Sequence, residues 1–502
     1  MNEVLDPVPP LRAGVRLVPT PDGAGSALSD EVLGRRVKLD AAGASLAAAL
    51  DREQPLAELA ARVAGDEGRV RDAVAAFARL FLLATPRAGA LAADAERAAA
   101  AAEGSRDDVP IVVRGDARFT CTMCGSCCGG HNVPVFDDVL EGLADKIPAL
   151  EAATRTRKGL FVTLGKRPGA AGQVYCQLTH GSCVFLDDDA RCRIHGQWGA
   201  EAKPSACRIF PYELVATPDG VAISIQRECR GFVEARAGKR LADDLPNLRE
   251  VLRLVPELPR VRRVIETTAG RVVTWAEYQA LEDRLHDLVD AGDGDHAALF
   301  SGLRAEVLGD AAPDGAAGTD LASLRDDLDG IAGGLLSAIG QLKGMMPPPT
   351  GETLIRGEAL DHFALGLAHL RDELPRVMHP LRRPDLVSLL KDHLHHHLMG
   401  KGLAIARTVR VGLGHMAFQW ALSLAFAVAR AREVKRRHLV AQDVMDGLVM
   451  TSFMMRHDAF DGPVLARFDE PIASLFVDRW PALVAHAREL PEPDTRLEMV
   501  KF

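Results

Sequence analysis

The stretch CTMCGSCCGG, residues 121–130, decides how the chain is interpreted because it places four thiols within eight residues. Their spacing is C-x2-C-x2-C-C, and the other cysteines follow at wider intervals. All nine cysteines lie between residues 121 and 229 of a 502-residue chain. Cysteines that were buried incidentally would be scattered along the sequence. Their segregation therefore indicates a shared chemical role.

Gaps of two residues allow neighbouring sulfurs to converge on one centre, as in zinc knuckles and ferredoxin loops. Glycines inside and after the motif permit the tight backbone that such a loop needs. The adjacent Cys127 and Cys128 cannot both bind one metal in the same way. They serve two centres, or one of them has a structural or catalytic role. The candidate metal ligands are Cys121, Cys124, Cys127, Cys128, Cys176, Cys183, Cys192, Cys207 and Cys229.

Zinc and iron–sulfur clusters both accept four thiolates, so the spacing alone leaves both open. Structural zinc sites usually pair one C-x2-C with a second, and this sequence has no second pair. We therefore favour an iron–sulfur cluster of the [4Fe–4S] type, one or two per chain, with zinc as the alternative. His131, His180 and His195 lie nearby and are able to replace a thiolate, although each also suits a solvated loop.

The bulk composition describes an ordinary soluble globular protein, with 47% hydrophobic and 26% charged residues. A formal net charge of -9 argues against a nucleic-acid partner, which would require a basic face. The N-terminus lacks a basic region followed by an apolar run, so we expect no secretory signal and a cytoplasmic location. In that reducing compartment, clustered cysteines more often bind metal or react than form disulfides.

One apolar segment, residues 411–429, is long enough to span a bilayer. However, His415, Gln419 and Ser423 recur every four residues and form a polar stripe, and basic residues flank both ends. We therefore predict a buried helix of a helical domain and no membrane partner.

The predicted fold class is mixed and mainly α. A small winged-helix-like α+β domain covers residues 1–88, and an Ala-rich helical linker covers 89–110. A cysteine-rich metal-cluster domain follows at 111–240, and a C-terminal helical domain occupies 241–502.

In the first of these domains, GVRLVP (14–19) and RRVKLD (35–40) read as strands with a turn between them. Asp40 is a good N-cap for the next helix. A third helix is predicted to carry Val70, Val74, Phe77 and Phe81 on one face.

Four segments of this region carry a resemblance, namely LRAGVRLVP (11–19), RRVKLDAAGASLAAAL (35–50), PLAELAARV (55–63) and VAAFARLFLLA (74–84). Together they resemble PqqD-type peptide-binding domains. That resemblance implies that a peptide or protein substrate is held against a strand edge, with backbone hydrogen bonds supplying affinity. A winged-helix-like fold with only a packing or partner role is the other interpretation.

The cysteine segment carries a second resemblance. CTMCGSCCGG, followed by CVFLDDDARCRIH (183–195) and KPSACRIFP (203–211), is similar to the YkgJ-type cysteine-cluster family of iron- or zinc-chelating proteins. The order of parts through residue 480 resembles the flagellin lysine-N-methylase branch. That branch implies an iron–sulfur cluster and methyl transfer from S-adenosylmethionine to protein lysines. It also implies eight of the nine cysteines as ligands, with Cys176 fitting the pattern least closely. The PqqD-like front end departs from this branch and leaves the substrate open.

The residues themselves identify neither a catalytic group nor a site for S-adenosylmethionine. No Gly-rich loop follows a strand, and no C-x3-C-x2-C occurs. In DHLHHHLMGK (392–401), His393 and His397 share a helix face at a spacing that suits a metal, or they belong to an exposed or interface run. Three hypotheses follow: a protein lysine N-methyltransferase or related peptide-modifying enzyme, a zinc- or cluster-stabilised partner-binding module, and a redox or electron-transfer protein.

Overall fold

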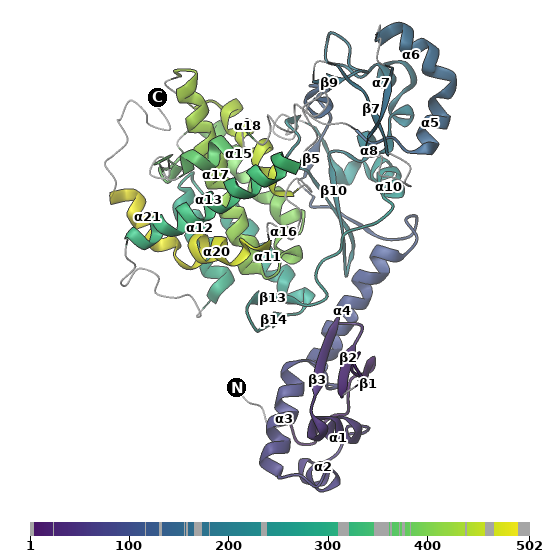
Figure 1. Cartoon of the computed structure of the whole chain (residues 1–502), viewed down its shortest axis with the longest axis vertical. Helices are drawn as coiled ribbons and strands as arrows, with labels where there is room; N and C mark the ends of the chain where they lie inside the picture. The colour runs from purple at the N-terminus through teal and green to yellow at the C-terminus, as the bar shows by residue number, and fades with distance from the viewer. Residues whose placement is uncertain are drawn as a thin grey trace.

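The structure is a computed structural model that describes residues 5–489, except 24, 116, 130–132, 155, 157–158, 165–172, 180, 232–237, 310–320, 346–360, 362–363, 371, 374–376, 382, 437–438 and 457–465. Figure 1 shows a large helical body with a smaller cysteine-bearing unit beside it. An N-terminal unit is joined to them through helix α4 (Pro86–Glu103). The architecture is mixed and mainly helical, as the sequence predicted.

The N-terminal unit contains a three-stranded antiparallel sheet of order β1-β2-β3. Strands β1 (Val15–Pro19) and β3 (Arg35–Leu39) match the two predicted strands. Strand β2 (Ser26–Asp30) lies between them and was missed. Its sequence SALSD has a pair of adjacent buried apolar residues, Ala27 and Leu28, instead of the alternation that marks a half-buried strand.

Three helices complete this unit: α1 (Ala41–Ala49), α2 (Leu56–Arg62) and α3 (Glu67–Arg79). Asp40 caps α1 as predicted, because its Oδ1 accepts a hydrogen bond from the Gly43 amide at 2.7 Å. The prediction for Phe81 was wrong. Helix α3 ends before it, and Phe81 takes a left-handed backbone with φ of 59°, so its ring leaves the helix face and lies 5.1 Å from the Arg35 guanidinium carbon.

A β-hairpin links the cysteine-bearing unit to the helical body. Its strands are β10 (Tyr212–Thr217) and β11 (Gly220–Ile225), and β4 (Ile111–Val112) adds to β11 in parallel. Every residue of β11 is buried. A strand covered on both faces reads as a continuous apolar run, which is why GVAISI gives no alternating pattern.

The cysteine-bearing unit is small and has its own core around Val135, Leu150, Phe185 and Ile194. Short helices and two-stranded ladders surround that core. They are α5 (Asp137–Leu143), α6 (Ile147–Thr154), β6 (Phe161–Leu164), β7 (Gln173–Cys176), β8 (Leu178–Thr179), β9 (Ser182–Cys183), α7 (Arg193–Trp198) and α8 (Ser205–Ile209), with the separate ladder of β5 (Arg118–Phe119) and β12 (Lys239–Arg240).

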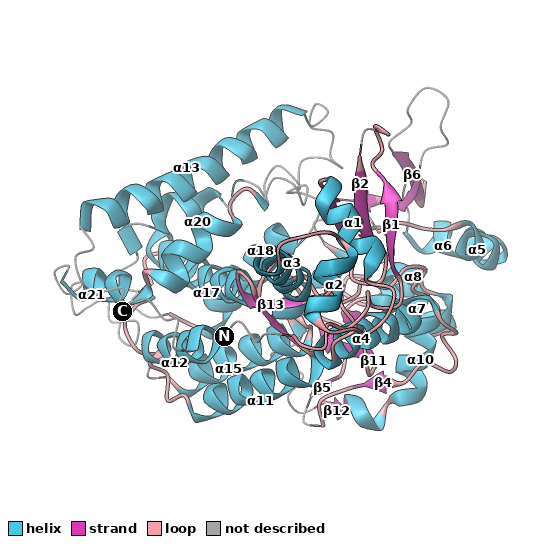
Figure 2. Cartoon of the chain, turned by 90° about the horizontal axis from the view of Figure 1, so that it is seen from below, coloured by secondary structure: helices cyan, strands magenta, loops and turns pink. Residues whose placement is uncertain are grey.

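The helical body comprises the remaining helices and one short ladder. Its elements are α10 (Leu245–Arg253), β13 (Ile265–Thr268), β14 (Arg271–Val273), α11 (Trp275–Ala291), α12 (His296–Leu308), α13 (Leu321–Met345), α15 (Pro384–Met399), α16 (Gly402–Ile405), α17 (Val409–Glu433), α18 (Ala441–Arg456), α20 (Asp469–Ala473) and α21 (Trp480–Glu489). Figure 2 shows α13 on the side of this body that faces away from α5 and α6.

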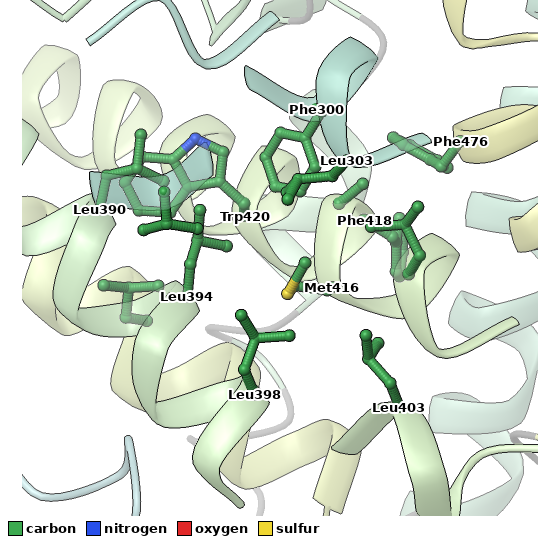
Figure 3. Packing of buried hydrophobic residues seen from close by; sticks show 14 of the residues in the cluster. Phe300, Leu303, Leu390, Leu394, Leu398, Leu403, Met416, Phe418, Trp420 and Phe476 are labelled. Carbon is green, nitrogen blue, oxygen red and sulfur yellow. The ribbon is translucent and has the colours of Figure 1, made fainter. Parts of the chain in front are cut away.

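Helix α17 forms the centre of the body. It is long and apolar enough to cross a membrane, but 94% of its most apolar 18-residue stretch is buried inside the protein. Figure 3 shows Trp420 and Met416 of α17 packed among leucines of α15 and Phe300 of α12. The predicted polar stripe is satisfied in part, because His415 Nε2 lies 2.8 Å from Asp469 Oδ1 and the Ser423 hydroxyl donates to the Gln419 carbonyl at 2.6 Å.

The predicted domain boundaries at residues 88, 110 and 240 remain predictions. The buried residues nevertheless group in a way that bears on them. Residues of the β10–β11 hairpin, such as Val215 and Ile223, pack in the same core as the helical body. The core of the N-terminal unit, in contrast, draws its buried residues from positions 8–83.

Close packing of α17 against α18 provides a test of the fold. A Cβ atom at Gly447 would lie 2.3 Å from the Ser423 carbonyl oxygen, so Gly447→Ala forces the helices apart. We expect it to destabilise the body by about 1–3 kcal/mol, as overpacking does. Gly330→Ala on α13 is the matched control, because a Cβ there meets nothing within 4 Å. It is expected to stabilise by about 0.5–1 kcal/mol through helix propensity. Thermal unfolding followed by circular dichroism measures both, and equal melting temperatures for the two variants would contradict the packing.

Candidate metal centre

The first four thiols lie on a tight loop at the surface of the cysteine-bearing unit. Cys121 and Cys124 are exposed, whereas Cys127 and Cys128 are half-buried in a short 3-10 turn, Ser126–Cys128. Gly125 has a φ of 72°, and a Cβ there would lie 2.9 Å from the Ala190 Cβ. Only glycine permits this approach, which brings the loop beside the turn that precedes Cys192.

The remaining thiols come from five separate elements. Cys176 ends β7, Cys183 ends β9, Cys192 is the N-cap residue of α7, and Cys207 lies in α8. Cys229 follows β11. The turn between the second and third of these is built by Asp187, whose Oδ1 accepts the amides of Asp189 and Arg191 at 3.0 and 2.8 Å.

Pairs of thiols are close enough to alter each other's pKa. The sulfurs of Cys127 and Cys128 are 3.9 Å apart. A hydrogen bond from the Cys128 thiol lowers the pKa of Cys127 to about 7 and raises that of Cys128. In the same way, a hydrogen bond between Cys176 and Cys183 raises the pKa of Cys176 and lowers that of Cys183. In each pair, the neighbour's proton stabilises the thiolate form of one cysteine, Cys127 or Cys183.

A second set of effects shows which thiols face the same region. Burial raises the pKa of Cys207 to about 12, and the Lys203 ammonium opposes that rise. The same ammonium group also favours the thiolate form of Cys127 and of Cys192. A single lysine that acts on thiols from three elements indicates that these thiols lie in the same region of the unit.

Cys229 faces the first loop instead. Burial raises the pKa of Cys229 to about 12, and negative charge on Cys127, Cys124 and Cys121 raises it further. Cys127 also acts on Cys183 and Cys207, so it connects the exposed thiols and Cys229 with the thiols of the later elements.

These thiols are of the type that binds metal, but their side chains are not arranged around one metal position in the described part of the chain. None of the nine forms a disulfide, and the pKa of Cys127 is lowered to about 7, which suits metal ligation. Within the part of the chain that the structure describes, no three Cys, His, Asp or Glu side chains are placed so as to hold a metal ion. The ligand set therefore stays a prediction. Of the alternative ligands, His195 lies half-buried on α7, and His131 and His180 lie outside the described residues.

The structure brings together a second group of polar residues that the sequence analysis did not assemble. On α15, His393, His396 and His397 are buried. The Ile225 amide at the end of β11 donates to His396 Nδ1 at 3.4 Å, so this helix packs on the strand that leads to Cys229. The histidine run is thus an interface run and not an exposed one.

Helix α11 contributes the facing side chains. The Tyr278 hydroxyl donates to Glu282 Oε1 at 2.8 Å, and the Lys401 ammonium pairs with the other carboxylate oxygen. Lys401 also lies 5.7 Å from the centroid of the Trp275 ring. We call Tyr278, Glu282, His286, His396 and Lys401 the polar layer. Tyr278, Glu282, His286 and Asp290 recur every four residues, and that stripe is the sequence signal that could have found it.

Comparison with known proteins supports the metal-binding interpretation of the cysteine segment. Residues 120–230 match the CxxCxxCC family, described as a "putative zinc- or iron-chelating domain". An uncharacterized protein of the archaeon Methanocaldococcus jannaschii is 25% identical over 141 residues, which cover 28% of this chain and 44% of that protein. The chain therefore matches less than half the length of this curated relative.

No solved structure matches the chain. The family match contains every cysteine, so the predicted resemblance to a metal-chelating cysteine family is confirmed for residues 120–230. The resemblances of residues 1–88 to PqqD-type domains and of the helical part to the lysine-N-methylase branch stay predictions.

The shifted pKa values predict an order of thiol reactivity after metal removal. Cys127 and Cys229 are both partly exposed, but the pKa of Cys127 is lowered to about 7 and that of Cys229 is raised to about 12. At pH 7.5 Cys127 is mostly thiolate and Cys229 mostly thiol. We expect iodoacetamide to label Cys127 on the order of a hundredfold faster, as judged by peptide mass spectrometry. Equal rates would contradict the arrangement, and bound metal should protect both.

Proposed function

We propose that the cysteine segment holds one or two iron–sulfur clusters of the [4Fe–4S] type and that the chain modifies a peptide or protein. The modification implied by the sequence resemblance is lysine N-methylation with S-adenosylmethionine as methyl donor. The observation that carries the proposal is the gathering of nine cysteines, none of them in a disulfide, in a segment that matches metal-chelating domains. We place the protein in the cytoplasm, where reducing conditions keep thiols free.

The protein's own groups support a bound cluster. The nine cysteines supply enough thiolates for one or two four-ligand centres. Lys203 offsets the negative charge of the thiolates, and the amides of His195 and Ile194 donate to the Cys192 sulfur. When bound, an iron–sulfur cluster supplies electron transfer or an iron that accepts a ligand from the substrate.

The N-terminal unit supplies a place for the substrate. Strand β1 lies at an edge of the three-stranded sheet, and its Leu17 side chain is exposed. An extended peptide can pair with such an edge through backbone hydrogen bonds, while exposed side chains select its sequence. The proposal includes no nucleic-acid and no membrane partner, in keeping with the net charge of -9 and the buried α17.

A second candidate is a non-catalytic module in which zinc staples the cysteine-bearing unit for partner binding. The observation in its favour is that the matching family is described with zinc as well as iron. An electron-transfer protein is a third candidate, and a cysteine count that is sufficient for two clusters favours it.

Metal analysis after anaerobic purification separates these candidates. We expect brown protein with about four iron and about four sulfide per chain for one [4Fe–4S] cluster, or about eight of each for two. Binding of S-adenosylmethionine and methylation of lysine peptides would then support the enzyme. Stoichiometric zinc without sulfide would contradict the cluster and leave the zinc module as the better account.

Single substitutions test the ligand set. Cys124→Ser is expected to lose most of the bound metal because it removes a thiolate from the first loop. Cys176→Ser is the comparison, since Cys176 is 1% exposed and fits the family spacing least closely. We expect it to retain more iron than Cys124→Ser. Iron content and the visible spectrum measure both variants, and the reverse order would require a different ligand set.

A further inference from the structure

Three side chains form a continuous line of hydrogen bonds from solvent to the polar layer. Asp290 Oδ1 lies 2.9 Å from His395 Nε2, and His395 Nδ1 lies 2.7 Å from His286 Nδ1. The side chain of Asp290 is 57% exposed and that of His395 is 13% exposed. His286 is 3% exposed. The line therefore begins in water and ends inside the protein.

The two imidazole rings meet edge to edge. Their centroids are 4.9 Å apart and their planes differ by 15°. Two nearly parallel rings with a nitrogen–nitrogen contact of 2.7 Å at this centroid separation lie side by side in one plane, with the contact between them. A face-to-face stack would not bring the nitrogens so close at that separation. This arrangement aligns an N–H with the lone pair of the other ring, as a strong hydrogen bond requires.

The hydrogen bonds fix the proton positions. The Asp290 carboxylate accepts, so His395 carries its proton on Nε2 and its Nδ1 is an acceptor. His286 must then donate from Nδ1, which leaves its Nε2 as a free base. Burial, with the positive charge of Arg114 second, lowers the pKa of His286 to about 2, so the His286 ring is neutral near pH 7. Proton transfer along the line therefore starts from a neutral His286.

Charged groups surround the line at both ends. At the outer end, Arg114 lies 3.8 Å from Asp290 Oδ2, and the Lys391 ammonium donates to the Asp290 backbone carbonyl at 2.7 Å. At the inner end, Lys401 and His396 are near enough to disfavour a positive charge on His286. The positive charges near His286 disfavour its protonated form, which leaves its ring able to accept a proton.

We propose that Asp290, His395 and His286 form a proton relay between solvent and the polar layer. A proton that reaches His286 Nε2 releases the proton on His286 Nδ1 to His395 Nδ1. His395 in turn passes its Nε2 proton to Asp290, which gives it to water. Each residue gains one proton and loses one, so a single passage carries one proton outward. Before the next passage, each ring must give up the proton it gained and take one on its other nitrogen.

The relay gives the proposed function a route for a proton that the reaction must release. A lysine substrate arrives as an ammonium ion, loses one proton, and uses the freed electron pair to form the N–C bond. The C–S bond of the sulfonium donor breaks at the same time, and its electron pair stays on sulfur. One proton thus leaves for each methyl group. The purpose of the relay rests on the proposed function, but its existence rests on the hydrogen bonds.

Hydrogen exchange at the buried imidazole tests the relay without any activity. In protein labelled with 15N-histidine, NMR follows exchange of the His286 Nδ1 proton with deuterium oxide. Asp290→Asn keeps an oxygen that accepts the His395 hydrogen bond but cannot take its proton. We expect this variant to slow exchange by about tenfold or more, since it removes the outer acceptor. Asp287→Asn, an exposed carboxylate on the same helix, should leave the rate unchanged.

A purely structural pair gives the opposite result. Its exchange would depend on local opening, so it would be slow in the natural protein and equal or faster in Asp290→Asn. That outcome would overturn the relay. If lysine peptides are methylated, Asp290→Asn should also lower kcat. We expect a loss of about ten- to hundredfold at low pH and a smaller loss at high pH, because deprotonation of the substrate lysine is most costly at low pH. Absence of methylation would count against the proposed function alone, since the exchange experiment does not depend on it.

Discussion

A strand that is buried along its whole length has to be covered on both sides, and this constraint on β11 organises much of the molecule. Helices α4 and α15 pack on the hairpin, and the Ile225 amide finds its partner in His396 of α15. The strand then runs directly into the segment that ends at Cys229. Next to that cysteine, Arg230 pairs with Asp446 of α18 at 2.5 Å. One covered strand therefore fixes the cysteine-bearing unit against the helical body.

This arrangement also explains why polar residues occupy the interior. Helices α11 and α15 bury polar groups that are cut off from water, and such groups need partners because unpaired buried groups are costly. On α11, Glu282 pairs with both Tyr278 and Lys401. The same requirement applies to the imidazoles between α11 and α15, and Asp290 at the edge of this interface connects them to solvent.

Much of the local structure could be predicted because it depends on short-range signals. The strands β1 and β3, the Asp40 cap and the burial of α17 follow from patterns within a few residues. The cysteine spacing likewise pointed to the metal-chelating family that residues 120–230 match. Strand β2 was missed because its pairing with β1 and β3 determines it, and such pairing leaves no periodic pattern in the sequence. The position of Phe81 was wrong because the helix ends before it, and the end of a helix leaves no periodic pattern either.

The candidate site was harder to predict than the fold. The nine cysteines are spread over several separate elements, so only folding reveals that Lys203 acts on three of them. The polar layer was missed for a different reason. Tyr278, Glu282, His286 and Asp290 look like the solvated face of an amphipathic helix, and nothing in α11 alone shows that α15 covers them.

The connection through α4 has a consequence for how such a chain can change over time. The N-terminal unit has its own core within residues 8–83. It contacts the rest where Leu33 joins Leu91 and Val272 in a small apolar cluster and where the Arg263 guanidinium donates to the Glu31 carbonyl at 2.6 Å. Mutations inside the unit that keep these contacts can therefore accumulate over time without disturbing the cysteines.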